Sequence, residues 1–235
     1  MSDTGSDRLL ATVRRQLSLG RLVPLGGPGD GAWLAERAAA PVLRRAAATV
    51  PGVAVTELRL AVAGEPAGEP AVPPPPSALP PGPLLIDARF AADDRIPLRE
   101  CAERVRAALA AAAGERLGLD VVAIDLEVTD LLAGEPPRPE PADRAVRGTP
   151  PPSGPGAHVA EAVLAVPGVR ALSGALGGPA RAVEIAAEEP LIRLQLAVGA
   201  ERRTLDIARA AARAAAGAAG SPPPRVAVLI TDIHP

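Results

Sequence analysis

Alternation of hydrophobic and polar residues predicts the strands of this chain. The clearest case is residues 121–131, where Val122, Ile124 and Leu126 face one way while Asp125 and Glu127 face the other. The same period of two, or a short apolar run bounded by turn residues, marks further strands. They are expected over residues 53–62, 84–90, 182–185, 191–198 and 226–233.

Apolar residues at helical spacing predict the segments between these strands to be helices. They are expected over residues 7–19, 33–49, 160–166 and 204–216, and from Pro97 to the glycines at 114 and 118. Pro41 should kink or split the helix at 33–49, because proline lacks an N–H and crowds the preceding turn. The glycine-rich residues 26–31 break the chain before that helix, and Asp30 is placed to cap it.

Two short phrases occur twice, in the same order. Val-Pro-Gly-Val stands at residues 50–53 and 166–169, and the closing strands end in Val-Thr-Asp-Leu at 128–131 and Ile-Thr-Asp-Ile at 230–233. Matched end points with the same elements between them predict a repeated unit of helix, strand, strand, helix and strand. We therefore expect an α+β protein in which each unit has a three-stranded antiparallel sheet covered on one face by helices. Counting from Pro83 and Pro190 aligns Leu98 with Leu205, although the preceding strands then disagree by one residue.

Four regions follow from this organisation. Residues 1–30 form an N-terminal amphipathic helix and turn, 31–132 the first unit, 133–157 a proline- and charge-rich disordered linker, and 158–235 a second, shorter unit. Within the first unit, residues 72–83 are a proline-rich insert that we expect to be an exposed, extended loop.

Composition narrows the function classes. Hydrophobic residues make up 48% of the chain, but Trp33 and Phe90 are its only aromatic residues, so the cores must be aliphatic. Every basic side chain apart from the two histidines is arginine, which is typical of a GC-rich bacterial genome, and the net charge is −2. Nothing in this balance steers the chain toward polyanions, and the aromatic platforms and basic groove of a nucleic-acid-binding protein are missing. We expect no nucleic-acid partner.

Cysteine usage and hydropathy set further bounds. Cys101 is the single cysteine, which excludes a disulfide framework and a thiolate zinc site. There is no apolar stretch of membrane-spanning length and no signal peptide. These features predict a cytoplasmic, soluble protein.

The repeated phrases also carry a family resemblance. A helix, Val-Pro-Gly-Val, a strand pair, a leucine-anchored helix and a final Val-Thr-Asp strand resemble the alkaline shock protein family of envelope stress response proteins, here in duplicated form. Residues 19–27 and 73–84 more closely resemble an actinobacterial group that bears the name nucleopolyhedrovirus P-ten family. The resemblance covers residues 19–132 well and 158–235 weakly. It implies a cytoplasmic protein that works near the cell envelope, often through a membrane-anchored partner, and it supplies no catalytic residues.

Few residues suggest chemistry. Residues 26–31 lack the Gly-Lys-Ser/Thr ending of a phosphate-binding loop, so we interpret them as a turn. His158 and His234 stand outside any cluster with metal-ligand spacing, and Cys101 lies on the apolar stripe of a helix, where a buried, inert thiol is expected. The acidic pairs at 93–94 and 188–189 are interpreted as solvated charge. We predict no catalytic, metal-binding or cofactor-binding residues, and no enzyme activity.

Two sets of residues remain as candidate contacts. Asp130 and Asp232 occupy matching strand ends and would continue the inward face of their strands; they are either turn residues or contacts to a partner or ligand. Arg8, Arg14 and Arg15 flank the apolar face of the helix at 7–19, which would either dock on the first unit or lie at anionic lipid.

We therefore expect a non-catalytic binding or scaffold protein linked to envelope stress or homeostasis. Its partner would be a protein, either membrane-anchored or a single-copy relative, with at most peripheral contact with the inner face of the membrane. The alternative is a regulator that binds a small molecule or nucleotide in the cleft between the two units.

Overall fold

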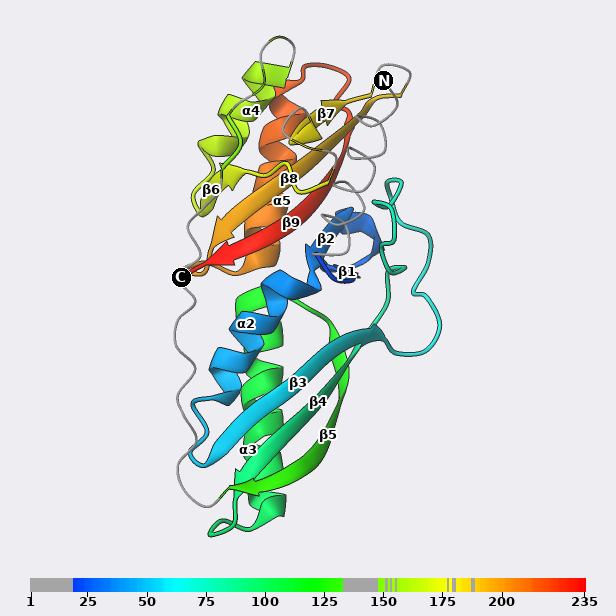
Figure 1. The fold of residues 1–235 in the computed structure, drawn as a ribbon. Coiled ribbons are helices and arrows are strands. Elements are labelled where there is room, and N and C mark those ends of the chain that lie inside the picture. The colour runs from blue at the N-terminus through cyan, green and yellow to red at the C-terminus, as the bar shows by residue number, and fades with distance from the viewer. Residues whose placement is uncertain are drawn as a thin grey trace, which may run out of the picture.

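Two units, each with helices on one face of a β-sheet, are stacked end to end in the computed structural model (Figure 1). The structure describes residues 19–132, 148–150, 152, 154, 156–176, 178, 181–186 and 189–235. The α+β class expected from the sequence is confirmed, with sheets of three and six strands. No helix in these ranges combines the length and the apolar character needed to cross a lipid bilayer.

The first unit is built on a three-stranded sheet in the order β3-β4-β5. Two helices, α2 and α3, cover one face of this sheet (Figure 1). Its elements in chain order are α2 (Glu36–Ala47), β3 (Val53–Val62), β4 (Leu84–Asp93), α3 (Leu98–Ala111), the π-helical turn η2 (Ala112–Leu117) and β5 (Val121–Leu132). Strand bounds agree closely with the alternation in the sequence, because one face of each strand packs on the helices and the other does not.

The second unit has a sheet with the path β1-β2-β9-β8-β6, and β7 also pairs with β8. Helices α4 and α5 cover one face. The unit's own elements are α4 (Gly156–Leu164), β6 (Val169–Leu172), β7 (Val183–Ile185), β8 (Leu191–Gly199), α5 (Thr204–Ala218) and β9 (Arg225–His234). The two strands on one side of β9, β1 (Leu22–Pro24) and β2 (Ala32–Ala35), come from the other end of the sequence.

The expectation of antiparallel sheets is wrong for one strand pair in each unit. Strands β3 and β4 are antiparallel, as are β6 and β8, but β4 pairs with β5 and β8 with β9 in parallel. The reason is the crossover helix. Helices α3 and α5 carry the chain back along the sheet, so the next strand starts at the same end as the one before it.

The N-terminal strands also correct the sequence analysis. Residues 32–35 do not begin the helix predicted at 33–49, because Trp33 and Leu34 pair in parallel with Leu229 and Ile230 of β9. Asp30 consequently does not cap that helix; it ends a short 3₁₀ turn, η1 (Pro28–Asp30), and accepts a hydrogen bond from the N–H of Gly27 at 2.8 Å. The segment at 22–35 thus belongs to the second sheet, across the predicted boundary at residue 31. The following helix α2 runs through Pro41 without interruption.

The repeated Val-Pro-Gly-Val phrase forms the same turn twice. Gly52 and Gly168 both have positive φ, 73° and 99°, a conformation that side chains other than glycine's rarely allow. Each glycine carbonyl accepts a hydrogen bond from the central strand, from Asp93 N at 2.7 Å and from Gly199 N at 2.8 Å. The phrase therefore forms the turn that leads into β3 and into β6. The origin of the two units by duplication stays a prediction.

Burial in α3 and α5 corrects the alignment of the two helices. Their fully buried residues match in the pairs Cys101 and Ile207, Val105 and Ala211, and Leu109 and Ala215. With these pairs in register, Leu98 corresponds to Thr204, each being the first residue of its helix, rather than to Leu205. The preceding strands then agree as well.

A buried glutamate joins the two units. Glu36 is 6% exposed, at the point where β2 of the second sheet passes into α2 of the first unit. Its Oε1 accepts a hydrogen bond from Leu60 N at 2.8 Å, and Nη1 of Arg21 donates to Leu60 O at 3.0 Å. These two side chains satisfy the edge of β3 at Leu60 in the way that a neighbouring strand would.

Candidate functional site

A groove of about 620 Å³ lies between the proline-rich insert of the first unit and the helix-free face of the second sheet. We call it the insert groove. One wall is formed by four consecutive prolines at 73–76, and the rest by strands β7, β8 and β9 and the loop before β7. These lining residues are Leu176, Arg181, Glu184, Arg193, Leu194, Gln195, Ala227, Val228 and Leu229.

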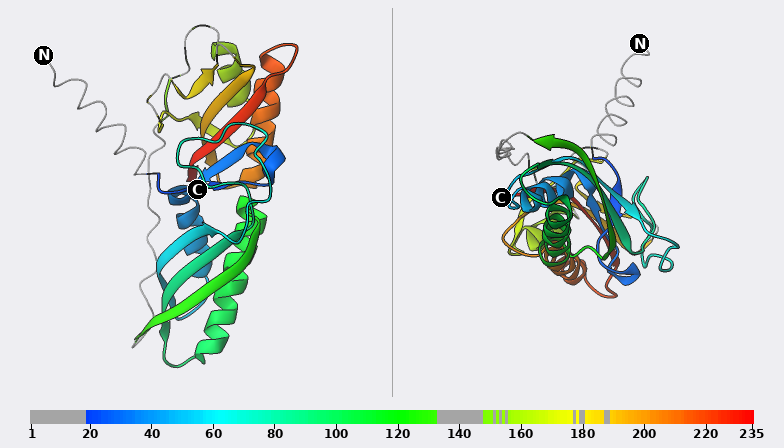
Figure 2. Two further views of the ribbon diagram at one scale, coloured as in Figure 1. Left: turned by 90° about the vertical axis from the view of Figure 1, so that its right-hand side faces the viewer. Right: turned by 90° about the horizontal axis from the view of Figure 1, so that it is seen from below.

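The insert reaches the second sheet because backbone hydrogen bonds tie it to the N-terminal segment. Ala71 N donates to Pro28 O at 3.0 Å, and Leu79 N donates to Leu22 O at 2.8 Å. Arg225 Nη1 of β9 also donates to Ala71 O at 3.2 Å. The left view of Figure 2 shows the insert crossing in front of the upper sheet. The predicted loop is thus extended, and Pro73, Pro74 and Pro76 are exposed as expected, but the loop is also docked on the other unit.

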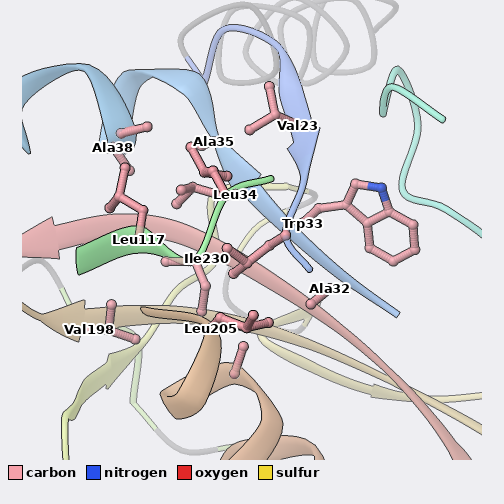
Figure 3. Close-up of a cluster of buried hydrophobic side chains, with 14 of the residues drawn as sticks. Val23, Ala32, Trp33, Leu34, Ala35, Ala38, Leu117, Val198, Leu205 and Ile230 are labelled. Carbon is pink, nitrogen blue, oxygen red and sulfur yellow. The ribbon is translucent and has the colours of Figure 1, made fainter. Parts of the chain in front are cut away.

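Trp33 lies on the same face of the sheet as the groove. It pairs with Leu229, so the two side chains share one face. Figure 3 shows its indole directed away from the cluster that contains Leu34, Ile230 and Leu205. The residue is only 1% exposed, and its Nε1 is buried without a hydrogen-bond partner in the described part of the chain. A buried N–H without an acceptor costs free energy, so the indole N–H of Trp33 is an unsatisfied donor on this face.

The polar groups of the groove are arranged in two sets. Glu184 pairs with Arg193 at 3.5 Å and with Arg181 at 3.9 Å, so one carboxylate is shared by two guanidinium groups. Gln195 is fully engaged with the loop before β7: it accepts from Leu176 N at 2.7 Å and donates to the carbonyls of Leu176 and Arg181 at 2.8 and 2.9 Å. The first set leaves a net positive charge beside an apolar floor. The second fixes the shape of the groove.

Asp130 and Asp232 take up the same local geometry in the two units. In β5 the register skips Thr129, and in β9 it skips Thr231, so each threonine is the extra residue of a β-bulge. Each hydroxyl donates to the neighbouring strand, Thr129 to Phe90 O at 3.4 Å and Thr231 to Leu196 O at 3.2 Å. The repeated Thr-Asp therefore marks a bulge.

The bulge overturns the prediction that these aspartates continue the inward face. Asp130 falls opposite Ala91, and Asp232 opposite Ala197, both on the outer face of the sheet. Asp130 is exposed and its Oδ1 accepts from its neighbour Leu131 N at 2.8 Å. Asp232 instead forms an ion pair with Arg37 of α2 at 3.9 Å.

The structure does not bring the two aspartates together. Asp130 lies near the end of β5 that points away from the second unit, whereas Asp232 lies at the junction (Figure 1). The junction contains a cavity of about 20 Å³ lined by Val42, Arg45, Arg116, Leu117, Ala200, Thr204 and Ile233. A water molecule occupies such a volume, and a nucleotide does not.

The other candidates from the sequence are dispersed. Cys101 is buried, as expected. His158 is exposed on α4 and His234 is buried at the end of β9. Within the described ranges, no group of three or more metal-binding side chains occurs. Arg8, Arg14, Arg15 and Glu188 lie outside the described residues.

Asp93 departs from the prediction of solvated charge. It is 4% exposed and accepts hydrogen bonds from the backbone N–H of Arg95 at 3.0 Å and from its Nε at 2.9 Å. The guanidinium of Arg95 lowers the pKa of Asp93 to about 2. This carboxylate therefore stabilises the turn between β4 and α3.

An ion pair between Asp30 and Arg209 connects the N-terminal segment to the second unit. Asp30 receives two hydrogen bonds from Arg209 of α5, from Nε at 2.7 Å and from Nη2 at 2.9 Å. The bonds from Arg209 and from the N–H of Gly27 lower the pKa of Asp30 below its ordinary value. Because Asp30 stands two residues before β2, this pair helps to keep β2 on the sheet.

The insert groove was not predicted from the sequence. The run of prolines at 73–76 was visible, but the surface that it covers is formed by residues a hundred or more positions away. No protein-family model, curated protein or solved structure matches this chain.

Proposed function

We propose that this protein is a non-catalytic binding and scaffold protein that holds an extended segment of a partner protein in the insert groove. The observation that carries the proposal is the groove itself, whose volume of about 620 Å³ lies within the ordinary range for binding sites.

The lining favours a peptide segment. Prolines have little conformational freedom to lose on binding, so the wall at 73–76 is rigid before any partner arrives. Ala227 and Leu229 supply an apolar floor for side chains, while Arg181 and Arg193 can orient a carboxylate or backbone carbonyls. Apolar contact with a few fixed polar groups is the usual composition of such a site.

The place of action rests on the family resemblance alone. It suggests a cytoplasmic protein near the inner face of the membrane, with a membrane-anchored protein or a single-copy relative as the partner. The sequence at Arg8, Arg14 and Arg15 suits peripheral contact with anionic lipid. The alternative regulator, with a ligand between the units, gains no support from a junction cavity of about 20 Å³.

The test is a display library of short random peptides panned on the full chain, with two variants in parallel. Ala227→Arg places a long charged side chain on the groove floor, where Ala227 is 4% exposed. Ala91→Arg adds the same side chain to the outer face of the first sheet, where Ala91 is also 4% exposed, and serves as the matched control. Trp33 is the only tryptophan of a chain without tyrosine, so intrinsic fluorescence reports on this face directly.

We expect enriched peptides to shift the Trp33 emission and to lose binding in Ala227→Arg but not in Ala91→Arg. Peptides that bind all three proteins equally, or no enrichment at all, would refute the proposed function. A thermal-shift screen of metabolites tests whether the groove binds a small molecule instead. A compound that raises the melting temperature of the wild type but not of Ala227→Arg would show that the ligand of the groove is a small molecule and not a peptide.

A further inference from the structure

The outer edge of β5 is open, whereas the corresponding edge of the second sheet is filled. Strands β5 and β9 occupy the same position in their units: each follows the crossover helix, pairs in parallel with the central strand, and has its bulge at the threonine of Thr-Asp. Within the ranges that the structure describes, β5 pairs only with β4, but β9 pairs with β8 on one side and with β2 on the other.

The added strand β2 shows what this edge accepts. Ala32, Trp33 and Leu34 pair in parallel with Val228, Leu229 and Ile230. Counted from the two bulges, those three residues of β9 correspond to Leu126, Glu127 and Val128 of β5. Under β2, Val228 and Ile230 are 1% and 0% exposed, whereas Leu126 and Val128 are only half-buried. The first sheet therefore leaves an apolar row incompletely covered.

The backbone of β5 is suited to pairing over a defined length. Bulges at Val122 and Thr129 bound a regular stretch at residues 123–128, which sets the length of a ladder. One carbonyl of this stretch, that of Ile124, already accepts a long bond of 3.5 Å from Arg106 Nε of α3. An unpaired edge of this kind is a template for strand addition.

The charge on the outer face of β5 indicates which kind of strand can pair with its edge. At the outer face, where β9 presents Ala227 and Leu229, β5 presents Asp125 and Glu127, both exposed. A second copy of β5 paired antiparallel about Leu126 would set Asp125 against Glu127, which is destabilising. A strand with arginine or lysine on its outer face would meet these carboxylates with opposite charge.

We propose that the edge of β5 at residues 123–128 binds an extended segment of another protein in which apolar residues alternate with arginine or lysine. The apolar residues cover Ile124, Leu126 and Val128, and the basic ones face Asp125 and Glu127. This surface is separate from the insert groove and lies on the other unit.

The test uses the full chain and a short fluorescein-labelled peptide in which valine alternates with arginine; a valine-glutamate peptide is the control ligand. The chain offers a matched pair of variants. Glu57 and Glu127 flank the same Arg89, at 3.5 and 2.8 Å, and both side chains are 60% exposed, but Glu57 lies on β3 at the opposite edge. Polarisation measures the affinity for Glu57→Arg and Glu127→Arg, and amide hydrogen exchange locates the peptide.

We expect Glu127→Arg to weaken binding of the arginine peptide by roughly three- to tenfold, and Glu57→Arg to change it by less than about twofold, because only Glu127 faces the added strand. Amides within residues 123–128 should gain protection. Equal losses in both variants, protection elsewhere, or no binding would overturn the proposal. Sedimentation showing a dimer of the unliganded chain that Glu127→Arg disrupts would overturn it too, since the occupant would be a second copy.

Discussion

The outer faces of the two sheets carry opposite kinds of residue on the same framework. On the outer face of the first sheet, five carboxylates and two guanidinium groups stand exposed; they are Glu57, Arg59, Asp87, Arg89, Asp125, Glu127 and Asp130. On the second, the row through Trp33, Leu229 and Gln195 lies under the insert and the loop before β7. One framework is thus compatible with a solvated face and with a covered one, and the residues on the outer face decide which.

The strand edges differ in the same way. Among the residues that the structure describes, the edge of β9 is filled by β2, that of β3 is satisfied at Leu60 by the side chains of Glu36 and Arg21, and that of β5 is unpaired. Open edges expose unpaired backbone, and natural proteins limit them with bulges and charge. Bulges and carboxylates are both present on β5. In the described residues, the first sheet therefore has one edge satisfied by side chains and one edge unpaired, whereas the β9 edge of the second sheet is paired with a further strand.

The largest expected effect comes from removing the side chain that completes the β3 edge. Glu36→Ala should lower the free energy of unfolding by about 3 kcal/mol, because it removes the acceptor of the buried Leu60 N–H and of the Arg21 N–H. Glu36→Gln keeps an acceptor oxygen at the same place and should cost less. Urea unfolding followed by circular dichroism measures both. Equal costs would mean that Glu36 contributes by its negative charge rather than by accepting the hydrogen bond of the strand.

A smaller effect should separate the filled edge from the open one. Val228→Ala and Val128→Ala delete the same atoms from the inward faces of β9 and β5, but Val228 is 1% exposed and Val128 half-buried. We expect a loss of about 2 kcal/mol for the first and about 1 kcal/mol or less for the second. The same urea titrations give both values. Similar losses would show that β2 adds little burial to its edge, and would weaken the contrast between the two sheets.

The sequence predicted β3, β4 and β5 well because their burial alternates, and alternation is what a one-sided strand imposes on a sequence. It failed at β2 because all four residues of Ala-Trp-Leu-Ala are buried, so they show no period of two. It also paired Asp130 with Asp232 correctly as a repeated position but misplaced their side chains. A bulge at the preceding threonine moves each aspartate to the other face, and periodicity cannot reveal an extra residue.

The candidate groove was beyond prediction for a different reason. Its two walls come from the insert and from strands near the C-terminus, and only the fold brings them together. The docking of the insert depends on backbone hydrogen bonds such as Ala71 N to Pro28 O, which leave no signature in residue type. The sequence did contain the unusual run of prolines, which predicts a rigid extended segment. It does not indicate on which surface that segment packs.

The smallest expected effect concerns the ion pair that keeps β2 in place. Asp30 has a folded-state pKa below its ordinary value, so its contribution to stability is complete above that ordinary value, 3.8, and is lost as the pH falls through the lower folded-state pKa. At neutral pH, Arg209→Ala should cost only about 0.5–1 kcal/mol, since the Arg209 side chain is 43% exposed and solvent screens the pair. The difference between wild type and Arg209→Ala should persist from pH 7 to pH 4 and shrink below it. Asp93, with a pKa of about 2, stays mostly ionised down to pH 3 and does not interfere. Unfolding followed by Trp33 emission measures these free energies and reports on β2 itself. A difference in unfolding free energy that did not change with pH would show that Arg209 acts through packing on the 3₁₀ turn and not through the charge of Asp30.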